Sequence, residues 1–207
     1  MSPSSWIETA AERSDLVRDA LALTWELHSG EWRETGAGKI PFIDHPLAVA
    51  ERLAEERLGE EVVAAGLLHD VIEYTHFPLP RLRDRFGVDV AAIVFALTED
   101  MGIENYEERK DELRQLVAEA GPDAWMVFAA DKVSNVEVLR RAYAIEGEEV
   151  DEDLPIELNR KILVWEDDLE MLFEETEPGK SRLVDRFASE MIELWGQRAK
   201  ELRSGLI

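Results

Sequence analysis

The sequence contains no cysteine, which excludes every site that depends on a thiol. The 207 residues can form no disulfide framework, thiolate zinc site or iron–sulfur cluster, and they offer no thiol nucleophile. Positive charge is also scarce, because 23 Lys and Arg oppose 46 Asp and Glu for a formal net charge of −23. Such a chain repels a phosphate backbone, so we expect it to bind no nucleic-acid polymer.

Long apolar runs are missing as well. No window approaches 18 uncharged apolar residues, and the first residues lack the pattern of a signal peptide, so we expect no membrane contact and a soluble, cytoplasmic protein. The chain is nevertheless 45% hydrophobic, which is too rich for a disordered acidic segment. We therefore expect a single folded domain over residues 1–207 with an acidic surface.

Apolar residues recur at spacings of three and four, and long alternating β-branched runs are absent, so we predict an all-α fold. Residues 31–44 are predicted to be a loop, and the acidic run at 146–153 a solvated loop. His45 is expected at the N-cap of a helix, just before Pro46. The predicted helices cover about residues 5–30, 45–59, 60–74, 79–86, 88–98, 104–120, 124–143, 154–175 and 181–202.

The third and seventh of these helices are apolar around nearly their whole circumference, so they must be buried, yet each carries ionisable residues. His69 and Asp70 interrupt the third helix, with Glu73 on the neighbouring face. Asp131 follows a seven-residue apolar run in the seventh helix, and Asn135 lies one turn later. A divalent cation held between the two helices would satisfy both clusters. A hydrogen-bonded core pair between the histidine and an aspartate is the alternative without a metal.

Several short segments occur in a characteristic order and carry a family resemblance. They are His28-Ser-Gly30 with Arg33, Pro41-Phe-Ile-Asp-His45-Pro, Ala64-Ala-Gly-Leu-Leu-His69-Asp70-Val-Ile-Glu73, Phe86-Gly87, Leu97-Thr98 and Ala130-Asp131-Lys132-Val-Ser-Asn135. The histidine and aspartate order is the H…HD…D pattern of the HD phosphohydrolase superfamily. Residues 20–139 resemble the hydrolase domain of the RelA/SpoT family and its small single-domain relatives. The resemblance implies an HD-type helical bundle with its metal-site core at about 20–143 and extra C-terminal helices at about 154–204.

The resemblance also implies the chemistry of the site. His45, His69, Asp70 and Asp131 would hold a divalent metal ion, most simply manganese. Glu73 would orient or deprotonate the attacking water, and with Asp70 it is the expected catalytic pair. A divalent cation can lower the pKa of its bound water from about 16 towards about 7, which yields a hydroxide nucleophile at neutral pH.

Five further residues are expected to contact the substrate. The resemblance implies that Arg33 contacts the nucleotide and that Asn135 contacts the ribose or a phosphate group. Arg33 and Lys39 form a basic pair where a polyphosphate would dock, and Lys132 is a further candidate for that role. Tyr74 stands where the family usually has a second aspartate. Its phenol hydroxyl is a candidate phosphate contact, and a space-filling role is the alternative.

The expected function is a metal-dependent phosphohydrolase acting on a small phosphorylated nucleotide, with guanosine 3′,5′-bis(diphosphate) 3′-pyrophosphohydrolase activity as the first candidate. A nucleotide or NADPH phosphatase is one alternative, because Tyr74 and Phe128 depart from the family pattern. A non-catalytic HD module that binds metal and nucleotide, or serves as an interaction domain, is another. The C-terminal helices, with Trp165 and Trp195, are expected to form core or a homodimer surface.

Overall fold

The computed structural model describes residues 5–35, 38–154, 156–176 and 179–204. Its elements are α1 Trp6–Arg13, α2 Asp15–His28, β1 Trp32–Glu34, β2 Lys39–Pro41, α3 Asp44–Glu55, α4 Glu60–Leu68, α5 Val71–Thr75, α6 Leu79–Phe86, α7 Val88–Ala96, α8 Tyr106–Ala120, α9 Pro122–Glu146, the 3₁₀ helix η1 Gly147–Asp153, α10 Leu158–Thr176 and α11 Arg182–Ser204. The predicted all-α fold is confirmed, since the sheet found among these residues has only two short strands.

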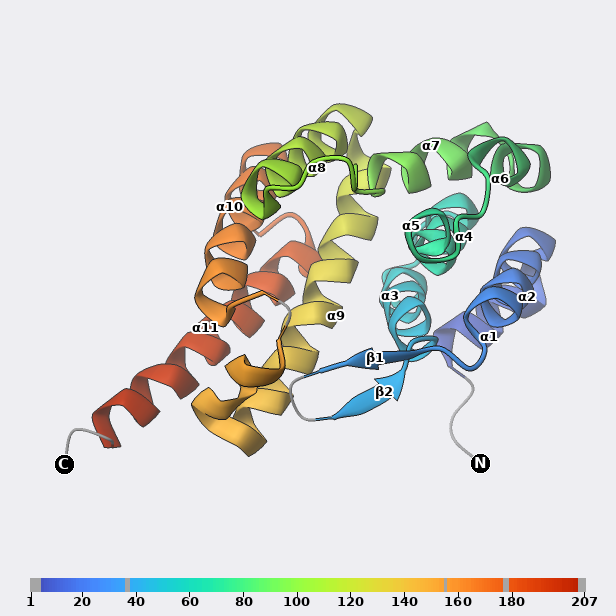
Figure 1. The fold of residues 1–207 in the computed structure, drawn as a ribbon. Helices are drawn as coiled ribbons and strands as arrows, with labels where there is room; N and C mark the ends of the chain where they lie inside the picture. Colours follow the sequence, from blue (N-terminus) through green and yellow to red (C-terminus); the bar gives the residue numbers. More distant parts are fainter. Residues whose placement is uncertain (1–4, 36–37, 155, 177–178, 205–207) are drawn as a thin grey trace.

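The core is built around α9, which lies between two groups of helices (Figure 1). The helices α3 and α4 pack on one side of it, and α8, α10 and α11 pack on the other. The predicted burial of α4 and α9 is confirmed. In α4 the buried residues are Val62, Val63, Ala64, Ala65, Gly66, Leu67 and Leu68. Since these residues face every direction around the helix, α4 can only be stable when it is enclosed by other elements.

Residues 31–44 differ from the predicted loop because they contain a β-hairpin. Strands β1 and β2 pair antiparallel, with Arg33 opposite Ile40. The turn is closed by Thr35, whose backbone N–H and hydroxyl both donate to the carbonyl of Gly38, at 3.0 and 2.8 Å. Strands of three residues are too short to show a period of two, which is why the sequence pattern missed them. The hairpin directs the half-buried Arg33 towards the site described below.

Two predicted helices are interrupted in the structure. The first divides at Ser14, whose hydroxyl oxygen accepts the backbone N–H of Val17 and caps α2. The predicted helix at 60–74 divides into α4 and α5, so that His69 and Asp70 lie at the junction. At this junction the side chain of His69 bonds to the carbonyl of Gly66, three residues earlier. Both ionisable side chains thus lie where the apolar helix α4 ends and not within it.

The remaining boundaries are close to those predicted, with two exceptions. Helix α3 begins at Asp44 with Ile43 at its N-cap, so His45 lies in the first turn and not at the cap. The acidic run predicted as a solvated loop forms η1, and its Val150 is fully buried. Among the described residues no helix combines the length and the apolar character needed to cross a membrane.

Candidate metal centre

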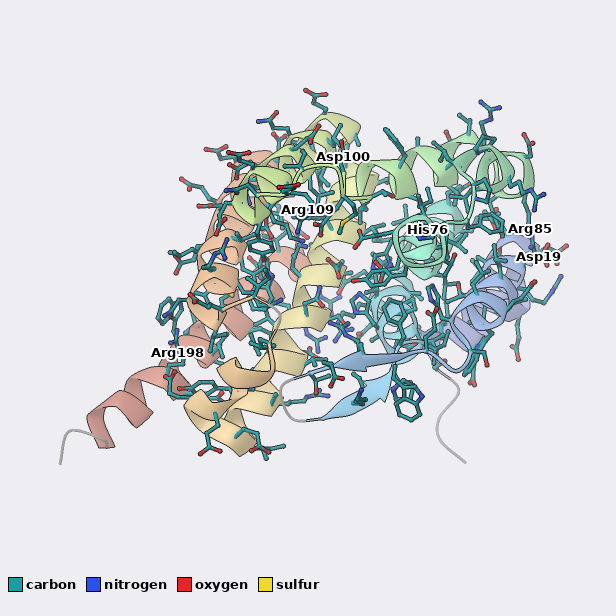
Figure 2. All side chains as sticks on the ribbon, in the orientation of Figure 1. Asp19, His76, Arg85, Asp100, Arg109 and Arg198 are labelled. Atoms are coloured by element: carbon teal, nitrogen blue, oxygen red, sulfur yellow. The ribbon has the colours of Figure 1, made fainter. Side chains whose placement is uncertain are left out.

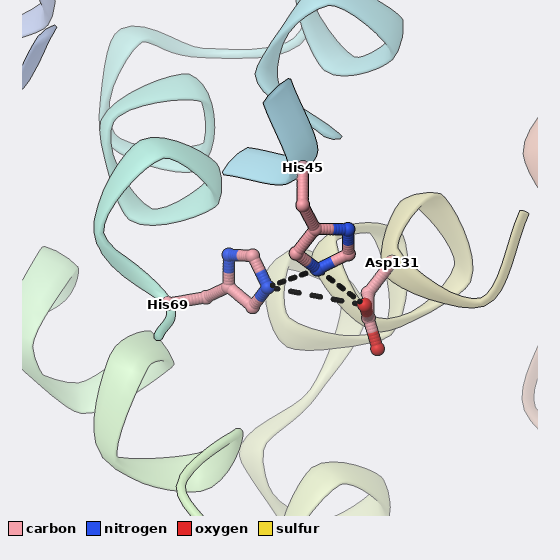
Figure 3. A group of neighbouring side chains, drawn as sticks. All are labelled: His45, His69 and Asp131. Carbon is pink, nitrogen blue, oxygen red and sulfur yellow. Dashed lines mark hydrogen bonds and ion pairs between the residues drawn. The ribbon is translucent and has the colours of Figure 1, made fainter. Parts of the chain in front are cut away.

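Three predicted ligands meet at one point of the structure (Figure 3). His45 comes from the first turn of α3, His69 from the end of α4 and Asp131 from the middle of α9, and all three are buried. The Nε2 atom of His45 lies 3.2 Å from Nε2 of His69 and 3.1 Å from Oδ1 of Asp131. Nε2 of His69 lies 3.8 Å from the same carboxylate oxygen. Three ligand-type atoms thus face one another across a few ångströms.

The outer nitrogens of both imidazoles are fixed by hydrogen bonds. Nδ1 of His69 lies 2.9 Å from the carbonyl oxygen of Gly66 and must donate to it, which leaves the lone pair on Nε2 facing the cluster. Nδ1 of His45 lies 3.2 Å from the hydroxyl of Ser134. Burial lowers the pKa of His45 and thereby favours its neutral form. A neutral imidazole oriented through its second nitrogen is the arrangement of a metal-binding histidine.

The carboxylate of Asp131 is held in its ionised form. Its Oδ1 accepts a hydrogen bond from the side-chain amide of Asn135 at 2.6 Å, and its Oδ2 pairs with Nζ of Lys132 at 3.0 Å. Burial alone would raise the pKa of Asp131, but Lys132 and then His45 more than offset it, so this pKa is well below its usual range. Asp131 can therefore supply a charged ligand oxygen at neutral pH.

Asp70 lies beside this group but outside its tightest part. Its Oδ1 is 3.4 Å from Nε2 of His69, and its Oδ2 is 3.6 Å from Nε2 of His45. Two imidazole nitrogens and one or two carboxylates form a donor set that suits first-row divalent metals. Nε2 of His69 presents its lone pair to the same point as the ionised oxygen of Asp131, and a divalent cation at that point would bind both of them. The residues present therefore fit a divalent ion.

The cluster lies in a cleft of about 840 Å³. The cleft is walled by the hairpin, α5, α8, α9 and α10. Of the predicted site residues, its lining includes Arg33, His45, His69, Asp70, Glu73, Tyr74, Asp131, Lys132 and Asn135. A cleft of this volume is large enough for a small-molecule ligand such as a nucleotide.

Glu73 lies in α5, one turn after Asp70, at the side of the cleft. One of its carboxylate oxygens lies 3.5 Å from the backbone nitrogen of Glu99, which donates to it. Burial, reinforced by the negative charges of Glu99 and Asp70, raises the pKa of Glu73 to about 7. A carboxylate with this pKa exchanges protons near neutral pH, which suits a general base.

The predicted substrate contacts fall on different walls of the cleft. Arg33 on the hairpin donates from Nη2 to the side-chain oxygen of Asn135 at 3.0 Å and so ties β1 to α9. Tyr74 is 54% exposed, and its ring centroid lies 4.6 Å from that of Phe42. Lys132 is almost fully buried, with its ammonium group 4.2 Å from the centroid of the Phe128 ring.

Lys39 is not brought into the cleft. It is exposed at the start of β2, and its ammonium group pairs with Oε1 of Glu34 at 2.6 Å. The cleft instead contains Lys110 of α8 and Lys161 of α10, which the sequence interpretation missed. Burial, together with the positive charges of Lys110 and Arg33, lowers the pKa of Lys161 to about 8.

The sequence contains one signal for Lys161. It lies three residues after Leu158 and four before Trp165, which are both buried, so it belongs to the apolar face of α10. A lysine on an apolar face requires a partner or a function. The pattern that drew attention to His69 thus also applied to this position.

The other two histidines have no place in the ligand group. His28 is buried and stacks on Phe42 with ring centroids 4.7 Å apart, while its Nδ1 lies 2.8 Å from a carboxylate oxygen of Glu31. His76 is exposed at the end of α5 (Figure 2).

Comparison with known families decides the relationship. The model of the HD domain matches residues 20–154, which is well over half of the sequence. The chain belongs to the HD-domain family. The resemblance predicted from the sequence motifs is confirmed, and α10 and α11 lie outside the matched HD region.

Named relatives of this HD-domain chain are long proteins. It is 33% identical over 141 residues to the putative GTP diphosphokinase RSH1, chloroplastic, of Oryza sativa subsp. japonica, covering 62% of this chain and 16% of that protein. It is 31% identical over 130 residues to a guanosine-3′,5′-bis(diphosphate) 3′-pyrophosphohydrolase of Aquifex aeolicus, with coverages of 62% and 18%. The chain thus spans less than a fifth of the length of these two relatives.

Two solved structures share the fold. The lmo0812 protein of Listeria monocytogenes EGD-e superposes with a TM-score of 0.68 at 27% identity, covering 73% of this chain and 99% of that one. A structure described as a metazoan ortholog of SpoT that hydrolyzes ppGpp also gives a TM-score of 0.68, at 22% identity and with coverages of 89% and 96%. The high coverage of both shows that the fold of this HD-domain chain also occurs in short proteins.

Proposed function

We propose that this HD-domain chain is a metal-dependent phosphohydrolase of a phosphorylated nucleotide, and that it removes the 3′-pyrophosphate of guanosine 3′,5′-bis(diphosphate). The observation that carries the proposal is the convergence of His45, His69 and Asp131 in a cleft beside Glu73. The activity for which the Aquifex relative is named supports this choice of substrate.

His45, His69, Asp70 and Asp131 are the proposed ligands, and manganese is the first candidate because mixed imidazole and carboxylate donors suit it. When bound, the ion would supply a more acidic water and would neutralise charge on the phosphoryl group. All four side chains line the cleft, and its other walls include the hairpin and α10, so the nucleotide would bind between these walls and the metal.

The chain's own residues then have distinct roles. Hydrolysis forms a bond between the water oxygen and phosphorus and breaks the bond between phosphorus and the 3′ oxygen, which takes up a proton from solvent and leaves as the 3′-hydroxyl. Glu73 accepts the proton of the attacking water on its carboxylate, which its pKa of about 7 allows at neutral pH. Arg33, Lys110 and Lys161 line the cleft and would bind phosphate oxygens. These cations lie among the acidic side chains of the same cleft, in a chain whose net charge is strongly negative.

Tyr74 favours a second candidate function. Its phenol lines the cleft at the position where the family usually carries an aspartate, so the site has one carboxylate fewer. A neutral hydroxyl does not repel a phosphate as a carboxylate does. The second candidate is therefore a phosphatase that releases a single phosphate from a nucleotide or from NADPH. A non-catalytic module is less well supported, because the Aquifex relative is named for a hydrolytic activity. A cytoplasmic location and a homodimer stay predictions.

The test is product analysis. Protein loaded with Mn²⁺ is incubated with guanosine 3′,5′-bis(diphosphate), NADPH and a panel of nucleoside monophosphates, and products are separated by anion-exchange chromatography with His69→Ala as the blank. We expect pyrophosphate and guanosine 5′-diphosphate from the first substrate. Phosphate released from another member would reassign the substrate and keep the chemistry. No product from any member, with metal bound, would overturn the enzymatic proposal in favour of a binding module.

A further inference from the structure

Charges of alternating sign lead from the metal centre into the C-terminal part of the chain. Oδ2 of Asp131 pairs with Nζ of Lys132 at 3.0 Å, and the same ammonium group lies 3.9 Å from Oδ2 of Asp168 in α10. The other carboxylate oxygen of Asp168 accepts a hydrogen bond from Nη1 of Arg114 in α8 at 2.8 Å. Three helices thus contribute to one row of four charges.

Asp168 is the most deeply buried member of this row. It is 2% exposed, compared with 5% for Lys132. Within the part of the chain that the structure describes, its Oδ2 accepts no hydrogen bond, and Lys132 is the cation that it faces. Burial of a carboxylate oxygen without a hydrogen bond is costly, so a stable fold retains it only where the charge has a use.

The surroundings of Lys132 indicate what the buried charge of Asp168 does. Its ammonium group is bounded by Asp131, by the ring of Phe128 and by Asp168, and the residue lines the cleft. A lysine side chain has four rotatable bonds, so it loses much conformational entropy when its ammonium group is held in one place. If Asp131 were its only partner, the ammonium group of Lys132 could take up several positions around that one carboxylate. Asp168 attracts it from a second direction and fixes its position relative to the cleft.

We propose that Asp168 is a positioning residue that holds the ammonium group of Lys132 at the wall of the cleft, where Lys132 binds a phosphate group of the substrate. The inference rests on the proposed function for the kind of ligand. Asp168 lies outside residues 20–154, which the HD-domain model matches. The C-terminal extension therefore contributes to ligand binding through a buried residue that does not itself touch the ligand.

The experiment is a double-mutant cycle between Asp168→Asn and Lys132→Met, with Asp167→Asn as the matched control. Asp167 is the neighbouring aspartate of α10, and it is exposed and 3.6 Å from Nη2 of Arg114. Binding of inorganic pyrophosphate in the presence of Mn²⁺ is measured by calorimetry, and KM and kcat are measured with the substrate found in the product analysis. Thermal unfolding is recorded for every variant.

We expect Asp168→Asn to weaken pyrophosphate binding and to raise KM about ten-fold, with kcat within about three-fold, since a charge-assisted contact is worth about 1.4 kcal/mol or more. In the Lys132→Met background the same change should alter affinity less than about two-fold. The control should match the wild type. If Asp168→Asn does not fold, Asp168→Glu, which shifts the carboxylate by one methylene, is measured in both backgrounds.

Each outcome decides one question. Wild-type affinity in Asp168→Asn, or an equal loss with and without Lys132, would overturn the positioning role. A wild type that does not bind pyrophosphate would overturn it as well. A wild type that binds pyrophosphate with the expected coupling but hydrolyses nothing would support the positioning role and remove the proposed function.

Discussion

Glu73 shows how strongly the surroundings of one carboxyl group decide its chemistry. It follows Asp70 by three residues and contacts the backbone of Glu99, so two negative charges lie near it in a partly buried place. Its raised pKa distinguishes it from Asp131, whose pKa is lowered by Lys132 although it is more deeply buried. The same functional group, a carboxyl, thus provides an ionised ligand at one position and a proton acceptor at another.

Glu73→Gln should abolish turnover and leave metal binding intact. The amide cannot accept the proton of water, and loss of a general base lowers rates by about 100-fold or more. Glu73 is not part of the three-residue ligand group, so metal content should stay at the wild-type level. Turnover is measured with the substrate from the product analysis, and metal content by elemental analysis. Glu108→Gln, at an exposed position of α8, is the control. A variant with more than a tenth of wild-type turnover would exclude Glu73 as the base.

The raised pKa of Glu73 also predicts the pH dependence of stability in the metal-free protein. The pKa rises from an ordinary value of 4.5 to about 7, so between these values the folded state keeps a proton that the unfolded chain releases. The free energy of unfolding therefore falls as pH rises through this range. One pKa unit corresponds to about 1.4 kcal/mol, so the loss through Glu73 is at most about 3 kcal/mol.

Glu73→Gln removes this loss. Relative to the wild type, the metal-free variant should gain stability as pH rises from about 4 to 8, by up to about 3 kcal/mol, and denaturant unfolding at both values measures the gain. The control variant Glu108→Gln should show the same pH dependence of stability as the wild type. A difference between Glu73→Gln and wild type that stays constant with pH would show that the pKa of Glu73 is ordinary.

Among the elements, the buried helices could be predicted from the sequence and their junctions could not. The apolar residues of α4 and α9 identify buried helices, and a polar group in such a helix needs a partner, which led to His69 and Asp131. The division between α4 and α5 depends on a bond from His69 to the backbone of Gly66, which no periodicity reveals. The hairpin was missed because strands of three residues have no readable period.

The walls of the cleft were less predictable than its metal centre. The ligands share short motifs with local spacing, whereas Lys161 of α10 reaches the cleft, and Asp168 of α10 reaches Lys132, only through tertiary packing. Lys39 was placed in the site because it follows Arg33 closely, but strand pairing sets it beside Glu34. Sequence separation indicates proximity within a helix, but it does not show which face of a hairpin points inward.

The contact between α3 and α4 depends on Gly66. A Cβ atom at this position would lie 2.3 Å from Cδ1 of the fully buried Leu53, and 3.6 Å from the Cα of Ala50. Because α3 carries His45 and α4 ends at His69, this close approach sets the distance between two proposed ligands. The absence of a side chain at position 66 is thus part of the geometry of the site.

Gly66→Ala should destabilise the protein by about 1–2 kcal/mol, because Leu53 has to move within a packed core and overpacking exceeds the gain in helix propensity. Gly196→Ala is the matched control, since position 196 is an exposed site of α11 with open space around it. That variant should be stabilised by up to about 1 kcal/mol. Chemical denaturation measures both. Equal stabilisation of the two variants would show that α3 and α4 are loosely packed at Leu53.

At the scale of the whole molecule, acidic side chains outnumber basic ones both over the chain and in its cleft. The net charge is −23, and the cleft lining has six acidic side chains against Arg33, Lys110, Lys132 and Lys161. The acidic remainder attracts cations in general, whereas the metal centre offers a defined set of donors. Any effect of a divalent ion on stability therefore contains a part from screening of the whole chain and a part from binding at one site.

Divalent metal should stabilise the protein through the site, beyond the effect of screening. A ligand that binds only the folded state adds about 2.7 kcal/mol at a concentration of 100 times its Kd, which for a chain of this size raises Tm by about 5–10 °C. Thermal unfolding is recorded for wild type and His69→Gln with Mn²⁺, with chelator, and with sodium chloride at matched ionic strength. Sodium chloride should raise both Tm values alike, because it screens the same net negative charge in both proteins. Only the wild type should gain the additional shift with Mn²⁺ and lose it on chelation. An equal Mn²⁺ shift in both proteins would assign the stabilisation to the acidic surface and leave His45, His69 and Asp131 as a hydrogen-bonded core cluster.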